Sequence, residues 1–125
     1  MGIIGGGQLA LMLARAASQL GLRARALDSS PECPARREIA DFCEGSHLSL
    51  AALDKLATDA DVITLENEFV EASLLAELEA KGHEVWPSSR TMSLVQDKLV
   101  QKQTLQNAAV CVVDFGPVND GASVP

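Results

Sequence analysis

Short apolar runs, several of them rich in β-branched residues, alternate along this chain with longer stretches whose apolar residues recur at helical spacing. The short runs predict strands at residues 2–4, 23–27, 39–44 and 61–65, and an extended stretch at 83–86. The longer stretches predict helices at residues 8–20, 49–60, 71–81 and from residue 89 onward. Because strands and helices alternate, we expect an α/β fold, a doubly wound parallel sheet of four or five strands covered on both faces.

Apolar spacing also predicts which helix faces are buried. In the first helix the i, i+4, i+7, i+8 pattern predicts a stripe packed on the sheet, formed by Leu9, Leu13, Ala16, Ala17 and Leu20. Ser49 is expected to cap the second helix and Ser89 to cap one long final helix. The apolar side of that final helix would carry Met92, Leu94, Val95, Leu99 and Leu105.

Composition narrows the class of protein. The chain has 125 residues, of which 47% are hydrophobic, enough for one domain with its own core. We assign residues 1–112 to this domain and residues 113–125 to a linker or the truncated start of a following region. The formal net charge of −7 argues against a nucleic-acid backbone or an anionic membrane as partner.

Cysteine usage and hydropathy indicate the compartment. The three cysteines are an odd number without a C-x-x-C pair, which predicts reduced thiols rather than a disulfide framework or a zinc site. No apolar run approaches the ~18 residues of a membrane span, and no signal peptide is visible at the N-terminus. We therefore expect a soluble, cytoplasmic protein.

A glycine-rich turn follows the first predicted strand. The pattern Gly5-x-Gly7-x-x-Ala10 fits the dinucleotide-binding fingerprint in its alanine-ended form, and Asp28 follows about twenty residues later. Backbone N–H groups at such a turn can approach a phosphate, with Gln8 beside them as a long amide. Many doubly wound proteins use the same turn only to pack a helix on the sheet, so a phosphate, a sugar phosphate and a nicotinamide cofactor all stay open.

Two carboxylates follow the predicted strand 61–65, at the edge where open α/β sheets bind ligands. Glu66 and Glu68 are two positions apart and are candidates to accept hydrogen bonds from ribose hydroxyls or an amino group. The alternative is a solvated loop in which Glu68 is stabilised by the N-terminus of the next helix. Lys98 and Lys102 lie one turn apart on one helix face, as solubilising charges or as phosphate partners.

Taken together, these motifs resemble a known family. The segments that carry the resemblance are GIIGGGQL at 2–9, LDSSP at 27–31 with PA at 34–35, DVITLENE at 61–68, PS at 87–88 and QDKLVQK at 96–102. In order and spacing they resemble the N-terminal domain of 5-(carboxyamino)imidazole ribonucleotide synthase, of the ATP-grasp family. The resemblance implies a Rossmann-like pre-ATP-grasp domain, similar to the N-terminal domain of biotin carboxylase.

The resemblance also implies a chemistry. In this family ATP phosphorylates bicarbonate, and the product carboxylates the amine of aminoimidazole ribonucleotide, with Mg²⁺ bridging the phosphates. By position, Lys98 would reach ATP, while the nucleotide and the metal are held mainly by following domains. The residues that would face the ribonucleotide are Gly6, Gly7, Gln8, Leu9, Glu66 and Glu68. We thus expect aminoimidazole ribonucleotide, bicarbonate and ATP as partners, a homodimer of the complete enzyme, and no activity of this chain alone.

Three other functions remain compatible with the motifs. A formate-dependent glycinamide ribonucleotide transformylase has a first domain of similar build with an acidic pair in a similar place. A nicotinamide-binding Rossmann domain would use Asp28 to bind the adenosine ribose, and would predict NAD binding by this chain. A non-catalytic interaction module would use the acidic domain only for docking.

Overall fold

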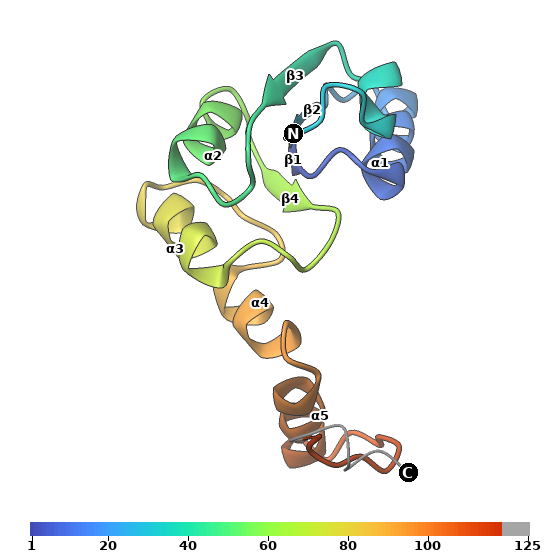
Figure 1. Cartoon of the computed structure of the whole chain (residues 1–125), viewed down its shortest axis with the longest axis vertical. Coiled ribbons are helices and arrows are strands. Elements are labelled where there is room, and N and C mark those ends of the chain that lie inside the picture. The colour runs from blue at the N-terminus through green and yellow to red at the C-terminus, as the bar shows by residue number, and fades with distance from the viewer. Residues whose placement is uncertain (119–125) are drawn as a thin grey trace.

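The structure is a computed structural model that describes residues 1–118. The predicted alternation of strands and helices is present, with a short 3-10 helix, η1, after the second strand (Figure 1). The elements are β1 (Gly2–Ile4), α1 (Gln8–Gln19), β2 (Arg25–Asp28), η1 (Pro34–Arg37), β3 (Asp41–Glu44), α2 (Leu50–Ala57), β4 (Ile63–Leu65), α3 (Ala72–Ala80), α4 (Ser89–Val95) and α5 (Lys98–Asn107).

The four strands form one parallel sheet in the order β3-β2-β1-β4. Gly2 of β1 lies opposite Arg25 of β2 and Ile63 of β4, so the central strand is paired on both sides. The extended stretch expected at 83–86 contributes a single parallel bridge, between Val85 and Ile63. Since the chain moves from β1 outward to β3 and then returns to the other side of β1, the topological switch point lies between β1 and β4.

Each face of the sheet has its own core. On one face the residues are small, with Ile3 and Ala26 packed against Ala10 and Ala14 of α1 and Ala35 of η1. On the other face larger side chains of α2 and α3 cover the sheet; those that are fully buried are Leu53, Leu56, Leu75 and Leu78. Figure 1 shows α1 and η1 on one side of the strands and α2 and α3 on the other. The predicted fold class is therefore confirmed.

The predicted buried face of α1 is wrong. The buried residues of this helix are Ala10, Leu11, Ala14 and Ala17. Of the predicted stripe only Ala17 is buried; Leu9, Leu13, Ala16 and Leu20 are exposed. The reason is distance: α1 packs closely on both the sheet and η1, and only an alanine-rich face fits there. Because α1 has apolar residues nearly all round, its periodicity alone could not select the inner face.

The prediction of a single long C-terminal helix is also wrong. The helix is interrupted at Gln96, and the structure has two helices, α4 and α5, in its place. Ser88, rather than Ser89, caps α4 by accepting from the N–H of Thr91 at 3.2 Å. Asp97 caps α5, and its carboxylate accepts from the N–H groups of Leu99 and Val100 at 2.8 and 3.0 Å. A carboxylate is a strong N-cap, so it starts a new helix here.

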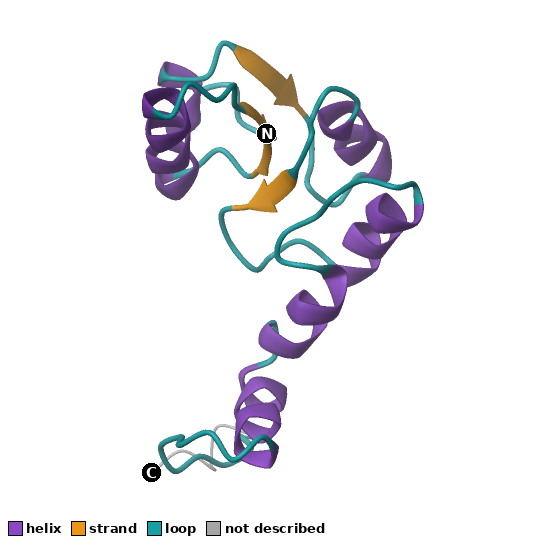
Figure 2. Cartoon of the chain, turned by 180° about the vertical axis from the view of Figure 1, so that it is seen from behind, coloured by secondary structure: helices purple, strands orange, loops and turns teal. Residues whose placement is uncertain are grey.

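Helices α4 and α5 extend the domain rather than covering the sheet. Met92 of α4 is buried against the larger core, and Val95 packs beside it. Leu94 and Leu105, which were expected on the apolar side of one helix, are exposed, and none of the described residues of α5 is buried. Figure 2 shows both helices leading away from the strands.

The C-terminal segment contains no helix or strand from residue 113 to residue 118. The remainder of the predicted linker, residues 119–125, lies outside the described residues. Within residues 1–118 no helix is both long and apolar enough to cross a membrane.

Candidate functional site

The carboxyl edge of the sheet brings together three loops that are far apart in the sequence. The glycine turn follows β1, Asp28 ends β2, and Glu66 follows β4. Backbone hydrogen bonds hold the loops in place, from the N–H of Gly5 to the carbonyl of Leu27 at 2.8 Å and from the N–H of Glu66 to the carbonyl of Ile4 at 3.1 Å. This edge includes the switch point between β1 and β4, where a ligand crevice is expected.

The Glu66 carboxylate lies over the glycine turn and caps α1. Its Oε2 accepts from the N–H of Ala10 at 3.0 Å, and its Oε1 accepts from the side-chain amide of Asn67 at 3.3 Å. The N-cap residue of α1 is Gly7, which has no side chain to satisfy these donors. Glu66 thus supplies, from another strand, the negative charge that a helix N-terminus favours.

Asp28 binds the other side of the same turn. Its Oδ2 accepts from the N–H of Gly6 and its Oδ1 from the N–H of Ser30, both at 2.8 Å. The carboxylates of Asp28 and Glu66 therefore occupy donors that a phosphate would need, and their charge would repel one. In this protein the backbone N–H groups at the fingerprint-like turn donate to carboxylates of the chain itself, and Asp28 has a structural role.

The glycines of the turn are explained by the side chains that pack against them, Glu66 at Gly5 and Gly7 and Cys33 at Gly6. Gly5 has φ +102°, a conformation that side chains other than glycine rarely adopt. A Cβ atom on Gly7 would lie 2.5 Å from Oε1 of Glu66 and 2.8 Å from its Oε2. A Cβ on Gly6 would collide with the sulfur of Cys33. The turn can approach Glu66 this closely only without side chains.

A shallow depression of about 350 Å³ begins next to Glu66. We call it the acidic groove, and it is lined by Leu65, Glu66, Asn67, Glu68, Pro87, Met92, Val95, Lys98 and Gln101. It brings together three of the predicted site residues, Glu66, Glu68 and Lys98. Within the described part of the chain its lining does not include Gly6, Gly7, Gln8 or Leu9; Gln8 and Leu9 are exposed at the start of α1.

Gln96, which the sequence analysis did not single out as a site residue, places Lys98 beside the acidic pair. Its amide nitrogen donates to the carbonyls of Glu68 and Val70, at 2.8 and 2.5 Å, and so ties the α4–α5 junction to the loop after β4. The only signal in the sequence was an amide directly before a helix-capping aspartate. Since α5 starts at Lys98, this anchor directs the first turn of α5 toward the groove.

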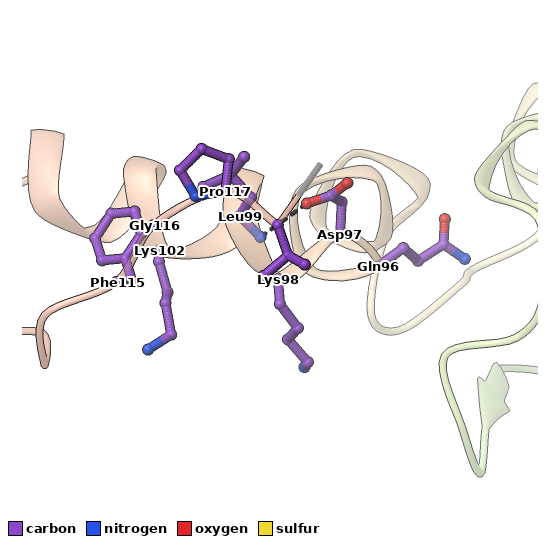
Figure 3. Close-up of a pocket in the computed structure, with 9 residues that line it drawn as sticks. Gln96, Asp97, Lys98, Leu99, Lys102, Phe115, Gly116 and Pro117 are labelled. Carbon is purple, nitrogen blue, oxygen red and sulfur yellow. Dashed lines mark hydrogen bonds between the residues drawn. The ribbon is translucent and has the colours of Figure 1, made fainter. Parts of the chain in front are cut away.

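A second depression lies on the other side of Lys98. We call it the basic hollow; it is lined by Gln96, Asp97, Lys98, Leu99, Lys102, Phe115, Gly116, Pro117 and Val118. Figure 3 shows the side chains of Lys98 and Lys102 projecting from the same side of α5. The ammonium of Lys102 lies 5.6 Å from the ring centre of Phe115, and that of Lys98 contacts the Gln101 side chain at 3.4 Å. Two lysines close together suit an anion with more than one negative charge.

Metal ligands are not gathered at either depression. Among the described residues no three or more His, Cys, Asp or Glu side chains are grouped so that they could hold a metal ion. The described residues therefore do not fit a Mg²⁺ site of their own.

Comparison with known proteins decides the family. The sequence model of the ribonucleotide synthetase preATP-grasp domain matches residues 1–96, most of the chain. The chain belongs to this family. The resemblance identified in the sequence is thereby confirmed.

Relatives with assigned names agree with this family. The chain is 42% identical over 118 residues to N5-carboxyaminoimidazole ribonucleotide synthase of Mycobacterium tuberculosis, covering 94% of this chain and 28% of the relative. A crystal structure of the Staphylococcus aureus synthetase complexed with ADP superposes with a TM-score of 0.87 at 35% identity, covering 98% of this chain and 33% of that one.

A further structure includes both ligand types. The synthase of Aspergillus clavatus, in complex with ADP and 5-aminoimidazole ribonucleotide, is similar with a TM-score of 0.78 at 33% identity, covering 86% of this chain and 28% of that one. This preATP-grasp chain therefore spans about a third or less of the length of these relatives.

The close approach of Glu66 to Gly7 predicts how a side chain at position 7 would change the free energy of unfolding. Gly7→Ala should lower the free energy of unfolding by about 1–3 kcal/mol, because Glu66 must move and release the N–H of Ala10. In a Glu66→Ala background the same substitution should cost much less. Urea unfolding of the four proteins measures this coupling.

Gly6→Ala is the matched control for this cycle. Its cost, also about 1–3 kcal/mol, should persist in the Glu66→Ala background, because a Cβ on Gly6 would meet Cys33 and Asp28 and not Glu66. Equal costs of Gly7→Ala in both backgrounds would show that Glu66 does not determine the need for glycine at position 7.

Proposed function

We propose that this chain is the N-terminal, ribonucleotide-binding domain of a longer N5-carboxyaminoimidazole ribonucleotide synthase, an ATP-dependent ligase of purine biosynthesis. The observation that carries the proposal is the position of Lys98, which lines both the acidic groove and the basic hollow. Lys98 thus lies between the acidic groove, which suits hydrogen-bond donors of a ligand, and the basic hollow, which suits anions. A ligase that brings an amine to a phosphorylated acid needs these two places side by side.

The acidic groove suits the donor groups of aminoimidazole ribonucleotide. Its amine and ribose hydroxyls are hydrogen-bond donors, and ionised carboxylates only accept. Glu68 is exposed, and within the described residues its carboxylate has no hydrogen-bond partner. Glu66 already accepts from Ala10 and Asn67, so we assign Glu68 the direct contact and Glu66 both a contact and the positioning of the turn.

The glycine turn and the start of α1 form the proposed second wall of the ribonucleotide site. Gln8 is exposed at the first turn of the helix, where its amide can both donate and accept. Leu9 beside it offers an apolar surface to a ring or sugar face. Gly6 and Gly7 directly precede Gln8 and complete this proposed wall, with Cys33 and Glu66 packed behind them.

The basic hollow suits the phosphates of ATP. Lys98 and Lys102 are directed to the same side of α5, and a charge-assisted contact with phosphate is stronger than a neutral one (Figure 3). Bicarbonate would be phosphorylated between the two depressions, next to the amine that it must reach. In a longer protein, Mg²⁺ and most of the nucleotide would be bound outside this chain, because the described residues do not fit a metal site.

The remaining parts of the proposal concern the complete protein. We assign residues 1–112 to the preATP-grasp domain and residues 113–125 to the connection that leads into the ATP-grasp region. The complete enzyme would be a homodimer in the cytoplasm. This chain alone would be inactive, because phosphoryl transfer depends on a metal and on several positioned charges, of which only Lys98 and Lys102 are present here.

A chimaera tests the proposed function. This chain should replace the 118 matching residues of the Mycobacterium tuberculosis relative and sustain ATP hydrolysis that depends on bicarbonate and aminoimidazole ribonucleotide. The chain alone, assayed in parallel, should show no turnover above background. A folded chimaera without turnover would contradict the proposal.

Lys98→Ala in the active chimaera should raise the KM for ATP about tenfold or more, since a hydrogen bond to a charged group contributes about 1.5–3 kcal/mol. The matched control is Lys55→Ala, which removes an exposed lysine of α2, a helix that lines neither depression. An unchanged KM for ATP in the Lys98 variant would show that this residue does not bind the nucleotide.

Substitutions of Glu66 and Glu68 should differ in their effect on thermal stability as well as on ribonucleotide affinity. Glu68→Gln should weaken ribonucleotide binding about tenfold while leaving the melting temperature and the KM for ATP unchanged, because it removes one exposed acceptor charge. Glu66→Gln should weaken ribonucleotide binding and also lower the melting temperature, because it alters the cap of α1. Calorimetric titration and thermal melts of both variants measure this; a Glu68 variant with normal ribonucleotide affinity would assign the contact elsewhere.

A further inference from the structure

The junction between α4 and α5 consists of two capping residues. Gln96 is the C-cap of α4 and Asp97 is the N-cap of α5, so no loop separates the two helices. Helix α4 is fixed to the domain, because Met92 is buried in the larger core and Val95 packs against that core. None of the residues of α5, all of which the structure describes, is buried. The direction of α5 therefore depends on the groups at this junction.

The side chain of Gln96 attaches the junction to the rest of the domain. Its amide nitrogen has two N–H groups and donates to the carbonyls of Glu68 and Val70. Among the described residues, no other hydrogen bond joins residues 96–107 to the chain that precedes α4. Figure 3 shows the Gln96 side chain projecting in a different direction from those of Lys98 and Lys102. Gln96 thus holds the first turn of α5 without occupying the side on which the lysines lie.

The two carbonyls that accept from Gln96 belong to residues with different surroundings. Val70 is 1% exposed and forms part of the larger core, so its carbonyl is a fixed point. Glu68 is exposed and lines the acidic groove, the proposed site of the ribonucleotide. A ligand that orders the loop at Glu68 would therefore also order the Gln96 amide and, through it, the start of α5.

Lys98 follows the cap of α5 directly and lines both depressions. A long side chain on a helix of variable direction loses conformational entropy when it binds a phosphate. Once the ribonucleotide has ordered the Glu68 loop, Gln96 and α5, part of this loss has already been met, so ATP binds more tightly. By linkage, ATP must raise the affinity for the ribonucleotide by the same factor.

From these contacts we propose that Gln96 is a positioning residue that couples ribonucleotide binding to ATP binding, by holding Lys98 of α5 in a fixed place relative to the Glu68 loop. The inference rests on the proposed function, because it takes the acidic groove as the ribonucleotide site and the basic hollow as the site of the ATP phosphates. Since the Gln96 amide already donates to two carbonyls of the chain, Gln96 acts through Lys98.

A distance measurement on this chain, without ligands, tests the positioning. In a Cys111→Ser background, spin labels at Ala76→Cys of α3 and Gln106→Cys of α5, both exposed positions, report the direction of α5. The distribution of distances between the labels should be narrow in the parent chain and broader in Gln96→Met, which keeps the side-chain length but has no N–H to donate. Gln103→Met, the same change at an exposed glutamine of α5, is the matched control and should leave the distribution unchanged.

An equally narrow distribution in folded Gln96→Met would overturn the proposal. Circular dichroism checks the fold of each variant. Should Gln96→Met not fold, Gln96→Asn takes its place, because the shorter amide keeps its donors but cannot reach both carbonyls, and it should broaden the distribution in the same way.

Calorimetric titration of the active chimaera tests the coupling. The dissociation constant of aminoimidazole ribonucleotide is measured in Mg²⁺ with and without a saturating non-hydrolysable ATP analogue, and the ratio of the two values is the coupling factor. The factor should be about tenfold in the parent and in Gln103→Met, and should be lost in Gln96→Met. A parent without coupling, or a Gln96→Met variant that keeps the parent's factor, would overturn the proposal.

The outcomes separate the role of Gln96 from the proposed function. A folded chimaera that binds no ribonucleotide would contradict the proposed function, while the spin-label distances would still decide whether Gln96 positions α5. An active chimaera that keeps its coupling in Gln96→Met would contradict only the role of Gln96.

Discussion

The hydrogen bond from the N–H of Ala10 to the Glu66 carboxylate joins the start of α1 to the end of β4, across the switch point of the sheet. Much of the local sequence follows from this contact. A carboxylate placed on a helix N-terminus stabilises it, but the side chain reaches that place only over residues that lack a Cβ atom. Gly5 and Gly7 meet this requirement, and Asp28 satisfies the neighbouring N–H of Gly6 in the same way.

This internal capping changes the chemistry of the edge. In a dinucleotide-binding domain the corresponding donors would face a phosphate. Here two carboxylates occupy donors of the turn, so the edge presents acceptors and negative charge. Positive charge is supplied instead by Lys98 of α5. Gln96 hydrogen-bonds the α4–α5 junction to the loop that contains Glu68 and so holds Lys98 near this edge. The acidic groove and the basic hollow are thus produced by different elements that meet at Lys98.

Much of the fold could be predicted from the sequence because its signals are local. The strands have β-branched runs, and Ser49 caps α2 as expected. Glu66 and Glu68 were recognised as site candidates because they follow a strand at the carboxyl edge of a parallel sheet, whatever the details of packing. Their approach to Lys98, thirty or more positions later, could not be predicted, because no local pattern specifies the turn at Gln96.

The sequence by itself determined the alternation of strands and helices, the parallel sheet, the family and the candidate acidic and basic residues. Hydrophobic periodicity, turn residues and motif spacing are properties of neighbours along the chain. Only the tertiary structure decided which face of α1 is buried, because a helix apolar on two sides takes the face whose side chains fit the space available. It also decided that the glycine turn receives Glu66 and Asp28. Whether a backbone N–H meets a phosphate or a carboxylate depends on which side chain arrives from another strand, and that is a matter of three-dimensional proximity.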